Sequence, residues 1–142
     1  HPFFVALHRL HGIRLRRQPG GDLGRRMSRA LASLLRDGAP AALLVGTDAA
    51  NLCAQDFRDA ASRLLENSDA VLQPASDGGY VLIGLREALG ESLRGVTWSS
   101  GRECAQTRSR LRARNLRVAL MPMREDIDHP GDVRRARRAG SL

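Results

Sequence analysis

Residues 41–48 read AALLVGTD, a continuous apolar run at 41–45 followed by a turn that ends on Asp48. A short apolar run bounded by turn residues is typical of a strand buried on both faces of a sheet. A carboxylate at the end of such a strand lies at the carboxyl edge of the sheet, where open α/β folds bind ligands. We therefore expect Asp48 to face a crevice above the sheet, and a turn-capping role is the alternative.

A second acidic loop, residues 76–80, reads SDGGY just before another apolar run. Its two glycines, Gly78 and Gly79, let the backbone approach a ligand closely or take a positive φ. The flanking Asp77 supplies an acceptor and Tyr80 an aromatic donor. The pattern predicts a ligand-contacting loop, and a tight turn without a ligand is the alternative.

The third acidic loop, residues 126–130, reads DIDHP. Asp126 and Asp128 are alternate residues, so in an extended backbone both carboxylates lie on the same side and face one cation. Carboxylate oxygens suit a hard divalent cation such as Mg²⁺ or Mn²⁺. Helix capping ahead of residues 131–138 is the other interpretation.

The only tryptophan, Trp98, precedes Ser99 and Ser100 and a predicted helix over residues 102–114. Either serine is a good helix cap. The free amides at a helix start also bind anions, so the segment is a candidate anion contact as well.

The composition indicates one domain over residues 1–142, with 42% hydrophobic residues and no low-complexity stretch. The chain lacks an apolar run of the roughly 20 residues that a membrane helix needs, and its first residues do not resemble a secretion signal. We expect a cytoplasmic protein that does not bind membranes. The formal net charge is +8, but the arginines are spread along the chain and no nucleic-acid-binding motif is present, so nucleic acid is not an expected partner.

Helix and strand patterns alternate along the chain. The order predicts a three-layer α/β/α sandwich with a mostly parallel sheet. Predicted helices cover residues 3–11, 22–37, 55–66, 102–114 and 131–138, and predicted strands cover residues 13–17, 41–45, 70–72, 80–85 and 116–120.

These motifs, in this order, resemble a bacterial glycosyltransferase-like family, the selenodomain-associated transferases or glycosyltransferase family A, within the nucleotide-diphospho-sugar transferase superfamily. A more distant similarity is to the guanylyltransferases of molybdenum-cofactor and phospholactate metabolism. The resemblance spans essentially the whole chain. The stretches that carry it are residues 18–27 (QPGGDLGRRM), 46–48, 77–80, 82–85, 98–100 and 126–130.

The resemblance implies a metal-dependent transferase with a nucleotide-activated donor, either a nucleotide sugar or a nucleoside triphosphate, and an unknown acceptor. Asp48, Asp126 and Asp128 would hold Mg²⁺ or Mn²⁺, and Asp48 and Asp77 would be catalytic. Residues 78–80, with Trp98 and Ser99, would bind the donor or acceptor. Glycosyl transfer is the first expectation and nucleotidyl transfer the alternative.

The sequence departs from the family pattern at two places. Relatives usually continue the Gly-Thr-Asp motif with Cys-Pro, where this chain has Ala49 and Ala50. Relatives also have a first strand and a basic, glycine-containing loop that hold the nucleotide, and nothing here matches them. We therefore expect an N-terminally truncated, incomplete domain: a fragment, a homodimer that covers the gap, or a non-catalytic binding relative.

Overall fold

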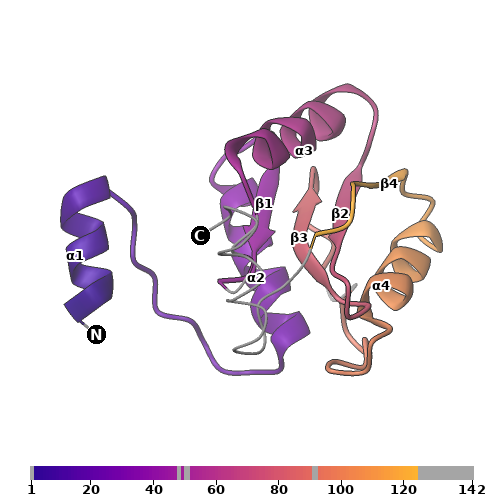
Figure 1. Ribbon diagram of the computed structural model, residues 1–142, viewed down its shortest axis with the longest axis horizontal. Coiled ribbons are helices and arrows are strands. Elements are labelled where there is room, and N and C mark those ends of the chain that lie inside the picture. Colours follow the sequence, from indigo (N-terminus) through magenta and orange to yellow (C-terminus); the bar gives the residue numbers. More distant parts are fainter. Residues whose placement is uncertain (1, 48, 50–51, 91–92, 125–142) are drawn as a thin grey trace, which may run out of the picture.

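The computed structural model describes residues 2–47, 49, 52–90 and 93–124. In this part of the chain, helices and strands alternate around one sheet (Figure 1). The elements are α1 (Pro2–His11), α2 (Leu23–Arg36), β1 (Ala42–Val45), α3 (Ala54–Glu66), β2 (Ala70–Pro74), β3 (Tyr80–Leu85), α4 (Glu103–Arg112) and β4 (Val118–Leu120).

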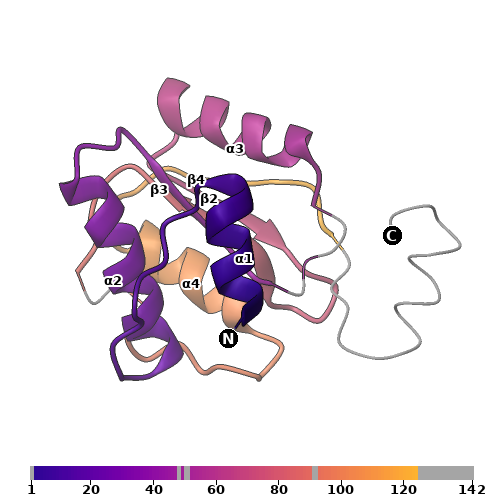
Figure 2. The same ribbon diagram turned by 90° about the vertical axis from the view of Figure 1, so that its left-hand side faces the viewer.

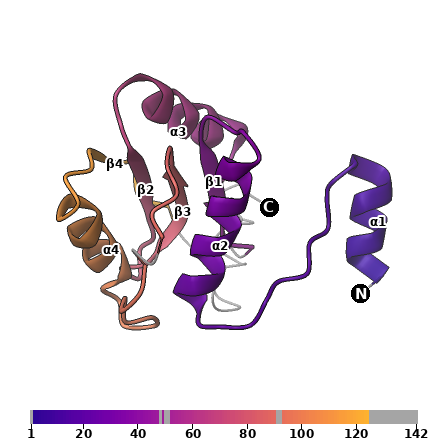
Figure 3. The same cartoon turned by 180° about the vertical axis from the view of Figure 1, so that it is seen from behind.

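The helices α2, α3 and α4 cover both faces of the sheet. Side chains of α2 and α4 pack with Leu72 and Ile83 on one face. Side chains of α3 pack with Val71 and Leu82 on the other face. Because neighbouring residues of a strand point to opposite faces, both cores draw on the same two strands. The predicted three-layer arrangement is therefore confirmed for the described residues (Figures 1 and 3).

The sheet is mixed, which corrects the expectation of a mostly parallel one. The strand order is β1-β3-β2-β4, with β3 antiparallel to both of its neighbours and β2 parallel to β4. The reason is the short turn at residues 75–79, because a parallel connection needs a crossover of a dozen or more residues. β3 therefore returns beside β2 and separates it from β1.

The boundaries of most predicted elements agree with the structure to within two residues. Asp22 caps α2 as expected, and its carboxylate accepts a hydrogen bond from the Arg25 amide at 2.8 Å. Residues 13–17, predicted to be a strand, form no regular element. Their alternating pattern is real, but none of the described strands pairs with them, and an unpaired strand leaves its backbone groups without partners. The predicted helix at residues 131–138 lies outside the described residues.

Helix α1 stands apart from the three layers, joined to α2 by an extended segment (Figures 1 and 2). All of its residues keep part of their surface exposed, including Phe3 and Phe4, whose rings meet edge to face. None of the described helices is long and apolar enough to cross a membrane.

A buried carboxylate, Asp56 at the start of α3, links three segments of the chain. One of its oxygens accepts hydrogen bonds from the Gln73 amide at 2.8 Å and from Nη2 and Nε of Arg124 at 2.8 and 3.1 Å. The other accepts from the Cys53 backbone amide at 2.9 Å. Burial alone raises the pKa of Asp56, but these bonds outweigh it and lower the pKa to about 2. The carboxylate is therefore ionised in the folded protein.

We expect Asp56→Ala to lower the free energy of unfolding by about 2–4 kcal/mol, because it leaves Gln73 and Arg124 without their shared acceptor. Urea denaturation followed by circular dichroism measures the change. Asp59→Ala, on the exposed side of the same helix, is the matched control and should change stability by less than about 1 kcal/mol. Equal losses in the two variants would contradict a structural role for Asp56.

Candidate functional site

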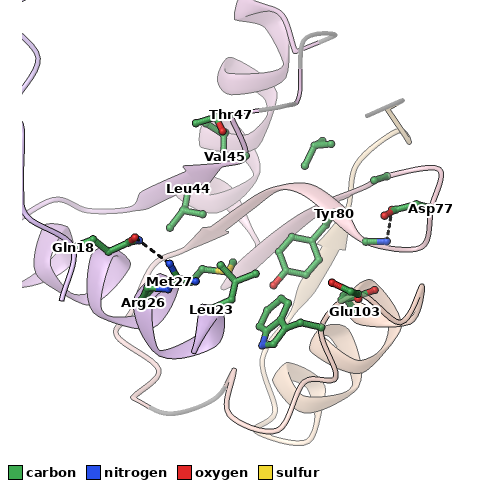
Figure 4. Close-up of a pocket in the computed structure, with 16 residues that line it drawn as sticks. Gln18, Leu23, Arg26, Met27, Leu44, Val45, Thr47, Asp77, Tyr80 and Glu103 are labelled. Carbon is green, nitrogen blue, oxygen red and sulfur yellow. Dashed lines mark hydrogen bonds between the residues drawn. The ribbon is translucent and has the colours of Figure 1, made fainter. Parts of the chain in front are cut away.

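A pocket of about 680 Å³ opens where β1 and β2 end and β3 begins (Figure 4). Because β3 is antiparallel to both neighbours, its first residues lie at the same edge as the last residues of β1 and β2. The start of α2 and the start of α4 complete the wall. The pocket is therefore at the carboxyl edge of the sheet, where the sequence predicted a ligand site.

Five of the predicted ligand-contacting residues line this pocket, although they come from two separate segments, the β2–β3 turn with the start of β3 and the segment before α4. They are Asp77, Gly79, Tyr80, Trp98 and Ser99. Their shared position is a finding of the structure, and their contact with a ligand stays a prediction.

The three predicted metal ligands, Asp48, Asp126 and Asp128, lie outside the described residues. Thr47, which directly precedes Asp48, lines the pocket. Among the described residues, no group of three or more histidine, cysteine, aspartate or glutamate side chains is arranged to hold a metal ion.

Asp77 lies in the tight turn between β2 and β3. One of its carboxylate oxygens accepts a hydrogen bond from the Gly79 amide at 2.7 Å, which is an Asx turn. The residue is exposed. Asp77 therefore holds the turn in shape while its carboxylate stays at the pocket wall.

Gly78 has a structural role, since it is absent from the pocket lining and packs against the segment before α4. Its φ is +91°, and a Cβ at this position would lie 2.0 Å from the carbonyl oxygen of Gly101. Its own carbonyl accepts a hydrogen bond from the Cys104 amide at 3.1 Å. This backbone contact explains why a glycine stands here, and the predicted contact of Gly78 with a ligand stays a prediction.

Tyr80 and Trp98 form the aromatic part of the pocket. Their ring centroids are 6.5 Å apart and the planes meet at 67°, an edge-to-face contact. Burial raises the pKa of Tyr80 to about 12; the hydrogen bond with Thr107 opposes this rise, and the charges of Cys104 and Glu103 add to it. The phenol is therefore neutral at physiological pH.

Ser100, and not Ser99, supports the start of α4. Its hydroxyl accepts a hydrogen bond from the Arg102 amide at 3.3 Å and donates to the Thr97 carbonyl at 2.6 Å. Ser99 has a φ of +56° and lines the pocket. The prediction that one of these serines caps the helix is wrong, because Arg102 occupies the N-cap position and no side chain caps α4; Ser100 instead bonds the backbone just before the helix.

Two charged residues of the pocket were not predicted as site residues. Arg26 comes from α2 and hydrogen-bonds Gln18 at 3.4 Å, while its Nε is buried without a partner in the described part of the chain (Figure 4). Glu103 begins α4 and is 7% exposed. Glu103 sits in an ordinary helical pattern, and Arg26 lies in the stretch 18–27 that carries the family resemblance, but the sequence assigned neither of them a role in the site. Arg26 and Glu103 are recognised as pocket residues only because the starts of α2 and α4 lie at the same edge of the sheet.

Comparisons with known proteins place the chain in a family. The model of the family described as "Uncharacterized protein conserved in bacteria (DUF2064)" matches residues 3–100. The chain belongs to the DUF2064 family. Among curated proteins, none matches it.

This DUF2064 chain is also similar to a solved structure. That structure is a "putative nucleotide-diphospho-sugar transferase" from Desulfovibrio desulfuricans G20, with 32% sequence identity and a TM-score of 0.72. The match covers 78% of this chain and 48% of the other, so the chain spans about half the length of that relative. The resemblance at the level of the superfamily and the α/β fold is thereby confirmed.

We expect Gly78→Ala to destabilise the fold by about 2–4 kcal/mol, because a methyl group would collide with the Gly101 backbone and the φ is unfavourable for alanine. Gly20→Ala is the matched control, since a Cβ there meets nothing within 4 Å. Thermal unfolding of both variants measures the difference. A Gly78→Ala protein as stable as the Gly20→Ala control would contradict the close contact between Gly78 and the Gly101 backbone.

Alkaline pH provides a test of Tyr80 burial. The phenol has an ordinary pKa of 10.0 and a folded value of about 12, so the unfolded chain loses its proton first. The stabilisation is present below pH 10 and is lost as the pH rises through 12, by up to about 2–3 kcal/mol. Urea midpoints across this pH range measure the loss of stability. Because phenylalanine has no ionisable hydroxyl, the Tyr80→Phe protein should lack the part of the loss that Tyr80 causes. Parallel losses in both proteins would contradict the burial.

Proposed function

We propose that this chain forms part of a metal-dependent transferase that uses a nucleotide-activated donor, with a nucleotide sugar as the donor and a glycosyl unit as the transferred group. The observation that carries the proposal is the pocket at the carboxyl edge of the sheet, in a chain whose similar solved structure is named as a nucleotide-diphospho-sugar transferase. The pocket combines aromatic surface, hydroxyl groups and charges of both signs, as a phosphorylated sugar ligand requires.

The carboxylates of Asp48, Asp126 and Asp128 are the proposed metal ligands. Hard oxygen donors fit Mg²⁺ or Mn²⁺, so the donor set suits the ion that the family resemblance implies. Thr47 lies in the pocket wall and immediately precedes Asp48. Arg124, two residues before Asp126, pairs with Ala75 at the end of β2, and Ala75 lines the same pocket. Both observations support a common location for these carboxylates.

Charge stabilisation is the chemistry proposed for this site. When bound, the metal ion would offset the negative charge that develops on the leaving diphosphate. Arg26 lines the same pocket, and its guanidinium is the proposed donor to a phosphate oxygen. Asp77 is the proposed acceptor of a proton from the hydroxyl of the attacking acceptor.

The test is a thermal-stability screen with nucleoside diphosphates, nucleoside triphosphates and nucleotide sugars, each with and without Mn²⁺. A ligand at about 100 times its dissociation constant adds about 2.7 kcal/mol, which raises Tm by several degrees in a domain of this size. We expect a metal-dependent rise for one nucleotide sugar and its diphosphate, and loss of the rise in Asp48→Asn.

Asp59→Asn on the exposed side of α3 is the control and should keep the full rise. A well-folded sample whose Tm responds to none of the nucleotides would contradict the proposed function. A rise with triphosphates alone would instead favour nucleotidyl transfer.

A further inference from the structure

A second pocket, of about 360 Å³, lies between α2 and the segment that joins β3 to α4. Four arginines from these two distant stretches of the chain line it, and it is here called the basic pocket: Arg25, Arg29, Arg36 and Arg94. Ser28 adds a hydroxyl group to the same lining. These residues are absent from the lining of the pocket at the carboxyl edge of the sheet, so the basic pocket is a separate site.

The spacing along α2 explains why three of these arginines meet. Arg25, Arg29 and Arg36 recur at intervals that place them on one face of a helix. The face with Met27 and Leu31 is buried in the core, whereas the three arginines are exposed. The arginine face is therefore open to a ligand, in a pocket whose volume is within the range of small-molecule sites.

The positive charge of α2 is not balanced within the helix. α2 contains four arginines and no acidic residue, whereas α3 carries both signs of charge. Like charges four residues apart, as at Arg25 and Arg29, destabilise a helix, and a cation in the first turn opposes the helix dipole. A preference for arginine over lysine does not explain the lack of acidic residues. The arrangement favours an anion that the helix does not supply.

The acidic residues around the basic pocket offset only part of its charge. Asp22 lies 3.7 Å from Nε of Arg25 through one oxygen, while its other oxygen caps α2. Asp37, at the end of α2, forms its ion pair with Arg16 at 2.8 Å. Glu91 follows Gly90 of the lining in sequence and lies outside the described residues. Even with Asp22 and Glu91 counted as full partners, the cations of the basic pocket outnumber the acids.

The chemistry of the lining indicates the kind of anion. A guanidinium group donates in a planar fork that matches two oxygens of a phosphate group. Arg29 commits one donor to the Gly20 carbonyl at 2.8 Å, and a guanidinium has five. Among the described residues that line the basic pocket, none is aromatic, so it offers no surface on which a nucleic-acid base stacks. The lining therefore suits a small anion with several phosphate groups.

We propose that the basic pocket binds a polyphosphate anion through its phosphate groups, either inorganic polyphosphate or the phosphate chain of a nucleotide. The inference does not rest on the transferase function proposed above, because it concerns a different pocket and needs no metal ion. Arg29 and Arg36 are the arginines on which binding should depend most, since Arg25 shares its charge with Asp22.

The experiment is isothermal titration calorimetry at low salt with EDTA present, so that metal-dependent binding at the other pocket does not contribute. The probes are tripolyphosphate, ATP, citrate as an anion without phosphate, and a short DNA duplex. Each is titrated into the wild-type chain, Arg29→Gln, Arg36→Gln and the double variant. Arg63→Gln, the same change at an exposed position of α3, is the matched control.

We expect tripolyphosphate to bind the wild type, each single variant to bind it about 10-fold more weakly and the double variant about 100-fold more weakly. Arg63→Gln should leave the affinity unchanged. Glutamine is a good helix former and the changes remove like-charge repulsion, so the unliganded variants should have a Tm no lower than that of the wild type. Their lost binding then cannot be attributed to lost folding.

The probes separate the sources of the anion. Weaker binding of tripolyphosphate alone in the variants would assign the basic pocket to inorganic polyphosphate, and an equal loss for ATP would assign it to a phosphate chain of either source. Tripolyphosphate that does not bind, or that binds all the proteins alike, would overturn the inference. Citrate that binds as tightly as tripolyphosphate would also overturn it, because the pocket would then not select phosphate. A DNA duplex that binds through Arg29 and Arg36 more tightly than tripolyphosphate would overturn it in favour of a nucleic-acid surface.

Discussion

The contact between Gly78 and Gly101 is the constraint on which the pocket depends. Neither position has a side chain, so the backbone of the β2–β3 turn packs directly against the segment before α4. A Cβ at Gly78 would collide with the Gly101 carbonyl oxygen and prevent this contact. The Gly78 carbonyl then accepts the Cys104 amide, which joins the turn to the first turn of α4. Because Tyr80 follows this turn and Glu103 begins α4, one backbone contact brings both to the same wall.

The hydrogen bonds of Asp56 also fix segments of the chain near the edge of the sheet where the pocket opens. A single buried carboxylate binds the start of α3, the side chain of Gln73 in β2, and Arg124 beyond β4. Arg124 also donates its amide to the Pro74 carbonyl at 2.9 Å. The segment that leads toward the third acidic loop is therefore held against the end of β2, which is the edge where the pocket opens.

Local sequence patterns predicted most of the elements because each pattern carries its own physical cause. The continuous apolar run of β1 and the amphipathic spacing of α2, with Asp22 as its cap, require no knowledge of distant residues. Residues 13–17 show the limit of this reasoning. Their alternating pattern predicted a strand, but a strand forms only beside a partner, and none of the described strands lies there.

The sequence by itself determined the α/β class, the alternation of helices and strands, the placement of Asp77 and Trp98 in loops, and the start of a strand at Tyr80. It did so because spacing and turn chemistry are local properties. The tertiary structure decided the strand order and the antiparallel direction of β3. It also decided the inclusion of Arg26 and Glu103 in the pocket, and the structural role of Gly78. These depend on which segments pack together across long stretches of chain, and no local pattern encodes that contact.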